Sequence, residues 1–115
     1  MITIYHNPRC SKSRQALALL EERALSPAVV KYLETPLDKQ ALKDLLTKLQ
    51  VNVRDIIRTS EKPYKENQLN DIALSDDQLL DAIATYPELL QRPIVVKDDQ
   101  AIIGRPPENV LTLIK

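Results

Sequence analysis

Apolar and polar residues follow two different periods along the chain, and the changes of period mark the expected elements. The apolar, β-branched run at residues 1–5 predicts a short strand that ends at the turn-forming pair Asn7-Pro8. Residues 11–24 repeat apolar positions every three or four residues, which predicts a helix, and residues 28–33 predict a second strand. A strand, a helix and a strand in this order predict parallel pairing with a right-handed crossover.

The middle of the chain keeps the helical period. Thr35-Pro36 predicts a helix start, because a cap residue is followed by proline at the first helical position. Ser75 and Gln78 have the spacing of a capping box, which predicts a helix that runs to Tyr86. The remaining middle segments are a predicted short helix at 53–58 and a predicted loop at 59–70.

Beyond Pro93 the period changes to two. Residues 94–103 predict a hairpin that turns at Asp98-Asp99, and residues 108–115 predict a closing helix. The expected fold class is therefore α/β: β-α-β, a helical insertion, then β-β-α, with a four-stranded mixed sheet. We expect a single domain over residues 1–115, with the helical insertion at about 35–87.

Composition excludes several classes of protein. The chain has 115 residues, 16 basic and 16 acidic side chains and only 3% aromatic residues, so neither net charge nor stacking platforms favour nucleic-acid binding. A single cysteine cannot form an internal disulfide. The sequence contains neither a signal-peptide pattern nor an uncharged run of roughly 20 residues, so we expect a cytoplasmic protein that does not enter a membrane.

The only cysteine, Cys10, lies in a strongly basic stretch at the expected start of the first helix. Arg9, Lys12 and Arg14 surround it, and the first acidic residue after it is Glu21. Positive charge and the free N–H groups of a helix start both favour the thiolate, which is the nucleophilic form of cysteine. A lone cysteine is more often a buried apolar filler, but a turn after a parallel strand is where open sheets bind ligands. The position therefore favours a reactive thiol.

Two neighbours are further candidates for the chemistry, and the spacing excludes other thiol sites. His6 could hydrogen-bond or protonate, and Ser13 could offer its hydroxyl from the same helical face, although a lone histidine is often structural. Ser13 also occupies the place of the second cysteine of a thioredoxin-type pair, and Ala16 the place of a phosphatase arginine. One cysteine and one histidine are too few ligands for a structural zinc site, so we expect no metal. A monothiol nucleophile remains.

The stretch "HNPRCSKSR" resembles the active-site loop of the glutaredoxin-coupled arsenate reductases, whose pattern is His-Asn-Pro-x-Cys-x-x-Ser-Arg. The segments "RDIIRTSEKPYKE", "QRPIVV" and "IIGRP" are also similar to that family, in the same order. Arg9 and the pair Ser11-Lys12 differ from the smaller residues of the well-studied members. The resemblance implies a thioredoxin-like fold with a helical insertion.

The resemblance also implies roles for individual residues. Arg58, Arg92 and Arg105 match the three arginines that hold the oxyanion, and Pro93 matches the cis-proline of thioredoxin folds. Cys10, His6 and Ser13 match the catalytic part of the loop. The loop would be supported by Asn7, Arg14 and Pro93.

Electron counting adds the expected partners. Reduction of arsenate to arsenite takes two electrons, and one thiol that enters a disulfide supplies one of them. The expected reaction therefore uses glutathione as co-substrate and glutaredoxin as the protein that clears the mixed disulfide, with no bound cofactor. Two alternatives stay open: a thioredoxin-like thiol oxidoreductase with another substrate, and a redox-sensing module that docks a protein such as RNA polymerase.

Overall fold

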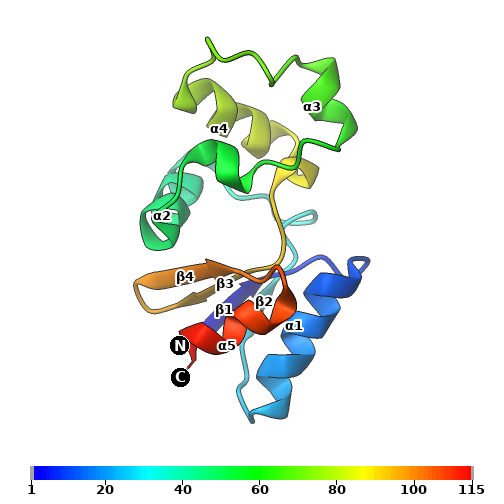
Figure 1. The fold of residues 1–115 in the computed structure, drawn as a ribbon, viewed down its shortest axis with the longest axis vertical. Helices are drawn as coiled ribbons and strands as arrows, with labels where there is room; N and C mark the ends of the chain where they lie inside the picture. The colour runs from blue at the N-terminus through cyan, green and yellow to red at the C-terminus, as the bar shows by residue number, and fades with distance from the viewer. Residues whose placement is uncertain (1, 115) are drawn as a thin grey trace. The chain divides into compact units, whose positions relative to one another are not determined.

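A four-stranded mixed sheet is the frame of the computed structural model, which describes residues 2–114 (Figure 1). The strand order is β2-β1-β3-β4. β1 pairs with β2 in parallel and with β3 antiparallel, and β3 pairs with β4 antiparallel. The strands are β1 (Ile2–Tyr5), β2 (Ala28–Val30), β3 (Ile94–Lys97) and β4 (Gln100–Ile103). The predicted α/β class, the parallel β-α-β start and the mixed sheet are confirmed.

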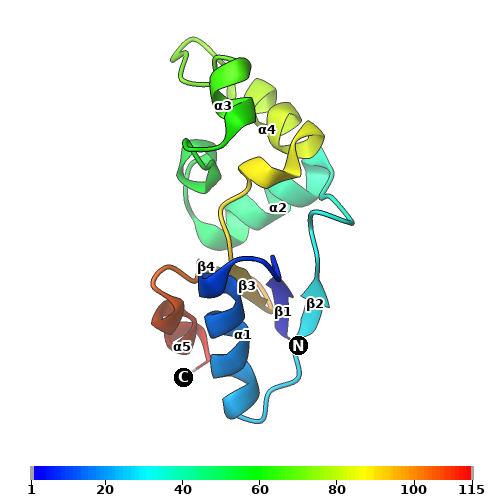
Figure 2. The same cartoon turned by 90° about the vertical axis from the view of Figure 1, so that its right-hand side faces the viewer.

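Two helices cover one face of this sheet, α1 (Ser11–Glu22) and α5 (Val110–Leu113) (Figures 1 and 2). Ile4 and Val95 are cross-strand partners, and each is fully buried. They pack with Ala16 and Leu20 of α1 and with Val110 of α5. Because strand side chains alternate between faces, this contact fixes the register of the central strands and therefore the position of their ends.

The chain forms two compact units. The sheet unit is Met1–Thr35 with Arg92–Lys115, and the helical unit is Pro36–Gln91. The helical unit consists of α2 (Lys39–Leu49), η1 (Val53–Ile56), α3 (Lys62–Glu66), α4 (Asp76–Thr85) and η2 (Pro87–Leu89). Leu42 and Leu45 of α2 and Leu79, Leu80 and Ile83 of α4 are all buried, and they give this unit an aliphatic interior.

Several local features agree with the sequence. Ser75 and Gln78 form the predicted capping box in front of α4. The hairpin turns at Asp98-Asp99 as predicted, and Asp98 adopts a φ of 57°, a value that aspartate tolerates well in turns. Among the described residues, no helix is long and apolar enough to cross a membrane.

The second helix and the predicted loop before α4 need correction. α2 begins at Lys39 rather than at Thr35-Pro36, because Asp38 is the cap and its carboxylate accepts the Ala41 N–H at 2.8 Å. The segment predicted as a loop at 59–70 contains the short helix α3, which has proline in its first turn. The helix was not predicted because the segment is polar and shows no apolar period; its buried residue is Pro63.

The other corrections are shorter elements. β2 ends at Val30, and residues 31–34 turn instead of continuing the predicted strand to residue 33. α1 ends at Glu22, and Ala24 adopts a φ of 61°. The closing helix, predicted at 108–115, is a 3-10 turn, η3 (Pro107–Asn109), followed by α5; Met1 and Lys115 lie outside the described residues.

Candidate active site

The sheet brings three strand ends to one edge. Tyr5 at the end of β1 is paired with Ile94 at the start of β3, and Ile94 is paired with Ile103 at the end of β4. The loop that leads to Cys10 follows β1, while Arg92 precedes β3 and Arg105 follows β4. Strand pairing therefore places the thiol-bearing loop and these two distant arginines at the same edge of the sheet.

Gly104 and Pro93 fix the geometry beside these arginines. The Arg92–Pro93 peptide bond is cis, as the resemblance implied, and so is the Arg105–Pro106 bond. The Gly104 N–H donates to the Pro93 carbonyl at 2.8 Å. A Cβ atom on Gly104 would lie 2.8 Å from Pro93 Cγ and 3.2 Å from Val110 Cγ1, so only glycine permits this close approach. The need for glycine at this position was missed from the sequence.

The loop before α1 is held by local hydrogen bonds. The Cys10 N–H donates to the Asn7 carbonyl at 3.0 Å, and the Arg9 N–H donates to Asn7 Oδ1 at 3.0 Å. Arg14 reaches back from the helix, where its Nη1 donates to the Pro8 carbonyl at 2.9 Å. Asn7 and Arg14 therefore brace the turn from both sides. Cys10 itself occupies the N-cap position of α1, where its side chain makes no capping hydrogen bond.

The surroundings of Cys10 favour its thiolate. The residue is 9% exposed. Burial alone would raise the pKa of the Cys10 thiol, but the Ser13 backbone N–H, the Arg92 charge, the Lys12 backbone N–H and the Arg105 charge together hold it below its usual value. Ser13 and Lys12 are the third and second residues of α1, where backbone N–H groups have no partner within the helix.

The direction of this pKa shift agrees with the sequence, but the main cationic contributions come from side chains other than those expected. Positive side chains of the loop, Arg9, Lys12 and Arg14, were expected to stabilise the thiolate. They are exposed to solvent, and the guanidinium of Arg14 binds a backbone carbonyl. The cationic side chains that contribute most to the lower pKa of Cys10 are Arg92 and Arg105.

His6 and Ser13 form a buried pair behind the loop. His6 Nδ1 and Ser13 Oγ are 2.6 Å apart, and Ser13 Oγ also accepts the Asn7 N–H at 3.0 Å. Burial lowers the pKa of His6, as do the charges of Lys31 and Arg14, and Glu21 opposes them only partly. The imidazole is therefore neutral near pH 7. The Ser13 hydroxyl, which was expected to serve the thiol, ties the loop after β1 to α1, while the Ser13 backbone N–H donates to Cys10. Catalytic roles for His6 and Ser13 stay predictions.

Arg58, the third predicted oxyanion ligand, belongs to the helical unit. The Arg58 backbone N–H donates to the Leu89 carbonyl at 2.8 Å, and the Arg58 Nε lies 3.6 Å from the Glu61 carboxylate. Its Nη1 is buried and has no hydrogen-bond partner among residues 2–114. An unsatisfied buried guanidinium nitrogen is costly, which makes it suited to an anionic ligand. Its role in binding an oxyanion stays a prediction.

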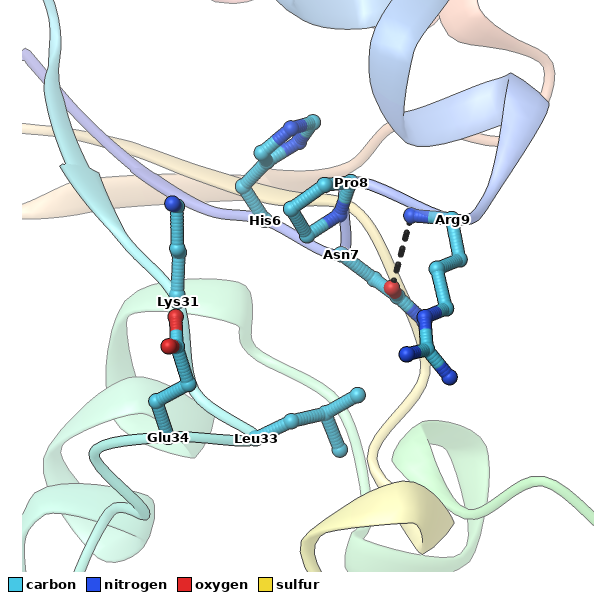
Figure 3. Close-up of a pocket in the computed structure, with 7 residues that line it drawn as sticks. All are labelled: His6, Asn7, Pro8, Arg9, Lys31, Leu33 and Glu34. Atoms are coloured by element: carbon cyan, nitrogen blue, oxygen red, sulfur yellow. Dashed lines mark hydrogen bonds between the residues drawn. The ribbon is translucent and has the colours of Figure 1, made fainter.

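A hollow of about 440 Å³ adjoins the loop on the side of β2 (Figure 3). It is lined by His6, Asn7, Pro8, Arg9, Lys31, Leu33 and Glu34. Lys31, Leu33 and Glu34 come from the turn after β2, where the sequence predicted that the strand continues through residues 31–33. Among the residues that the structure describes, no group of three or more histidine, cysteine, aspartate or glutamate side chains could hold a metal ion.

Comparison with known proteins places this site in a family. The family model for ArsC matches residues 5–113. The chain belongs to the ArsC family. This assignment confirms the resemblance of the loop "HNPRCSKSR", and ArsC relatives share the thioredoxin-like fold.

ArsC relatives match almost the whole chain. An arsenate reductase of Neisseria meningitidis serogroup A is 52% identical over 110 residues, which are 95% of this chain and 94% of that protein. YfgD, an uncharacterized protein of Escherichia coli K12, is 51% identical over 114 residues, with 98% and 96% covered. The solved arsenate reductase of Vibrio cholerae is 53% identical, covers 96% of this chain and 95% of its own, and has a TM-score of 0.95.

Proposed function

We propose that this protein reduces arsenate to arsenite through Cys10, with glutathione and glutaredoxin as the source of electrons. The observation that carries the proposal is the thiol at the start of α1, whose pKa is lowered partly by Arg92 and Arg105 from the neighbouring strand ends. The same two guanidinium groups offer forked donors that suit a tetrahedral oxyanion. The names of the arsenate reductase relatives support arsenate as that oxyanion.

The first step is nucleophilic attack. The Cys10 thiolate attacks arsenic, a sulfur–arsenic bond forms, and one arsenate oxygen leaves as water after it takes up protons. Arg92 and Arg105 hold the remaining oxygens, and Arg58 is the third ligand that we propose. A lowered thiol pKa supplies the nucleophile near neutral pH.

The second step needs a thiol from outside the chain, because Cys10 is the only cysteine. A glutathione thiolate attacks Cys10 Sγ, so that a disulfide bond forms and the sulfur–arsenic bond breaks. The electron pair stays on arsenic, which leaves as arsenite. Two thiols are oxidised to one disulfide, which balances the reduction of As(V) to As(III). A glutaredoxin thiolate then attacks the glutathione sulfur and releases Cys10.

A coupled assay on the purified protein tests this function. Arsenite should form when arsenate, glutathione and glutaredoxin are all supplied. With thioredoxin as the only thiol source, arsenite should form much more slowly. Intact mass should show a glutathione adduct on Cys10 that glutaredoxin removes. The Cys10→Ser variant should give neither adduct nor arsenite, because a serine hydroxyl is too weakly acidic to replace the thiolate.

Four outcomes would contradict the proposal. Turnover by the Cys10→Ser variant would exclude Cys10 as the nucleophile, and efficient arsenite formation with thioredoxin alone would exclude the monothiol scheme. If glutathione adds to Cys10 while no arsenite forms, the protein is a thiol oxidoreductase with another substrate. If binding of RNA polymerase subunits is unchanged in the Cys10→Ser variant and no arsenite forms, the docking alternative is favoured.

A further inference from the structure

The hollow beside the loop lies on one side of Cys10 and the hairpin arginines on the other. In the strand order β2-β1-β3-β4, the Cys10 loop follows the inner strand β1. Lys31 and Glu34 follow β2 on one side of it, while Arg92 and Arg105 flank β3 and β4 on the other. The thiol therefore stands between two separate groups of charged side chains, of which the proposed oxyanion site uses only one.

The charges in the hollow are open to a ligand. Figure 3 shows the side chains of Arg9, Lys31 and Glu34 around it, together with Leu33. Within residues 2–114, the charged ends of Arg9, Lys31 and Glu34 make no hydrogen bond or ion pair. Leu33 is 41% exposed and adds an apolar wall. Two cations, one carboxylate and a small apolar surface complement a molecule with two carboxylates, one ammonium group and a short aliphatic body.

We propose that this hollow binds the external thiol, a γ-glutamyl tripeptide of the glutathione type, and we call it the thiol seat. The proposal rests on the proposed function, which requires such a thiol. Glutathione carries two carboxylates and one ammonium group, and these match Arg9, Lys31 and Glu34. Arg9 precedes Cys10, so their Cα atoms are about 3.8 Å apart, and an extended tripeptide spans roughly 10 Å. Because Arg9 lines the hollow and directly precedes Cys10, the proposal places the cysteinyl sulfur of a ligand in the hollow at Cys10 Sγ.

Disulfide exchange without arsenate tests the seat directly. The Cys10 thiolate attacks one sulfur of oxidised glutathione, a mixed disulfide forms on Cys10, and one glutathione thiolate leaves. The second-order rate constant is measured by intact mass and divided by that for the uncharged bis(2-hydroxyethyl) disulfide, which corrects for changes in thiol reactivity. This ratio should fall about two- to fivefold in Lys31→Ala and in Arg9→Ala, the range for single exposed ion pairs.

Lys12→Ala is the matched control, because Lys12 is an exposed cation two residues from Cys10 that does not line the hollow. Its ratio should stay close to that of the unaltered protein. A fall in Lys12→Ala equal to that in Lys31→Ala would mean general attraction of anions and would overturn the seat.

Glu34→Gln gives a test of sign. Loss of the carboxylate should lower the rate constant for reaction of Cys10 with oxidised glutathione, because the ammonium group of the ligand loses its partner. It should raise the rate constant for 3,3′-dithiodipropionate, which has the same net charge and no ammonium group. Faster reaction with both disulfides would overturn the proposal. Because arsenate is absent from these reactions, the seat can fail while arsenite formation with glutathione still succeeds, and the reverse result is equally distinguishable.

Discussion

The loop at residues 6–14 and the β3–β4 hairpin both bring arginines to the edge of the sheet where Cys10 lies, but they use them differently. In the loop, Arg14 donates to a backbone carbonyl and Arg9 is exposed beside a hollow. In the hairpin, the charges of Arg92 and Arg105 lower the pKa of the Cys10 thiol. The arginine side chains nearest in sequence thus shape the loop or lie exposed, while two arginines more than eighty positions away lower the thiol pKa together with the backbone N–H groups of Ser13 and Lys12.

The difference has a simple electrostatic origin. A charge on a long side chain in water is screened, whereas a charge beside a buried thiol acts through a medium of lower dielectric constant. Arg92 and Arg105 are both partly buried, while Arg9, Lys12 and Arg14 are exposed. Sequence distance therefore says little about which cation stabilises a thiolate.

The largest effect should come from removal of the hairpin charges. We expect Arg92→Ala or Arg105→Ala to lower kcat/KM for arsenate reduction by about 10- to 100-fold, the loss expected for a hydrogen bond to a charged group. Lysine at either position should restore only part of the lost kcat/KM, because a point charge lacks the forked donors of a guanidinium group. Lys12→Ala is the control, and an equal loss there would remove the distinction between loop and hairpin.

The glycine that supports the hairpin gives a second test. Gly104→Ala should lower the free energy of unfolding by about 1–3 kcal/mol, because the new methyl group overlaps Pro93. Urea denaturation measures this loss. Gln100→Ala, an exposed change in the same hairpin, should stay within about 0.5 kcal/mol. Equal stabilities of the two variants would show that the Gly104–Pro93 contact does not hold the hairpin.

The corresponding support in the loop is Ser13. Ser13→Ala leaves the Asn7 N–H and His6 Nδ1 without their buried partner, so we expect a loss of about 1–2 kcal/mol in the free energy of unfolding. Ser11→Ala, at an exposed position of the same helix, is the comparison. If both serine variants unfold at the same urea concentration, the buried pair does not stabilise the loop.

Local patterns were the predictable part of the fold. The capping box at Ser75 and the turn at Asp98 depend on neighbouring residues, so the sequence was enough to find them. Thr35-Pro36 is an equally local signal for a helix start, but the helix begins later because the Asp38 carboxylate caps the Ala41 N–H. The helix α3 was missed because its polar stretch shows no apolar period.

The site was predictable only in outline. The place of Cys10 at a strand-to-helix turn followed from the pattern, and the arginines followed from the resemblance. The helix-start N–H groups that lower the thiol pKa were predictable from the sequence, but the contributions of Arg92 and Arg105 were not, because strand pairing brings these residues to the edge. The same holds for Lys31 and Glu34, which line the hollow only because β2 stops at Val30 and turns.

The most direct test of the central claim is the pKa of Cys10, measured from the rate of alkylation against pH. In the unaltered protein the midpoint should lie below the usual thiol value. The double variant Arg92→Ala/Arg105→Ala should raise this pKa clearly, while Arg9→Ala/Lys12→Ala, which also removes two cations, should leave it nearly unchanged. A larger rise in the loop variant than in the hairpin variant would contradict the account.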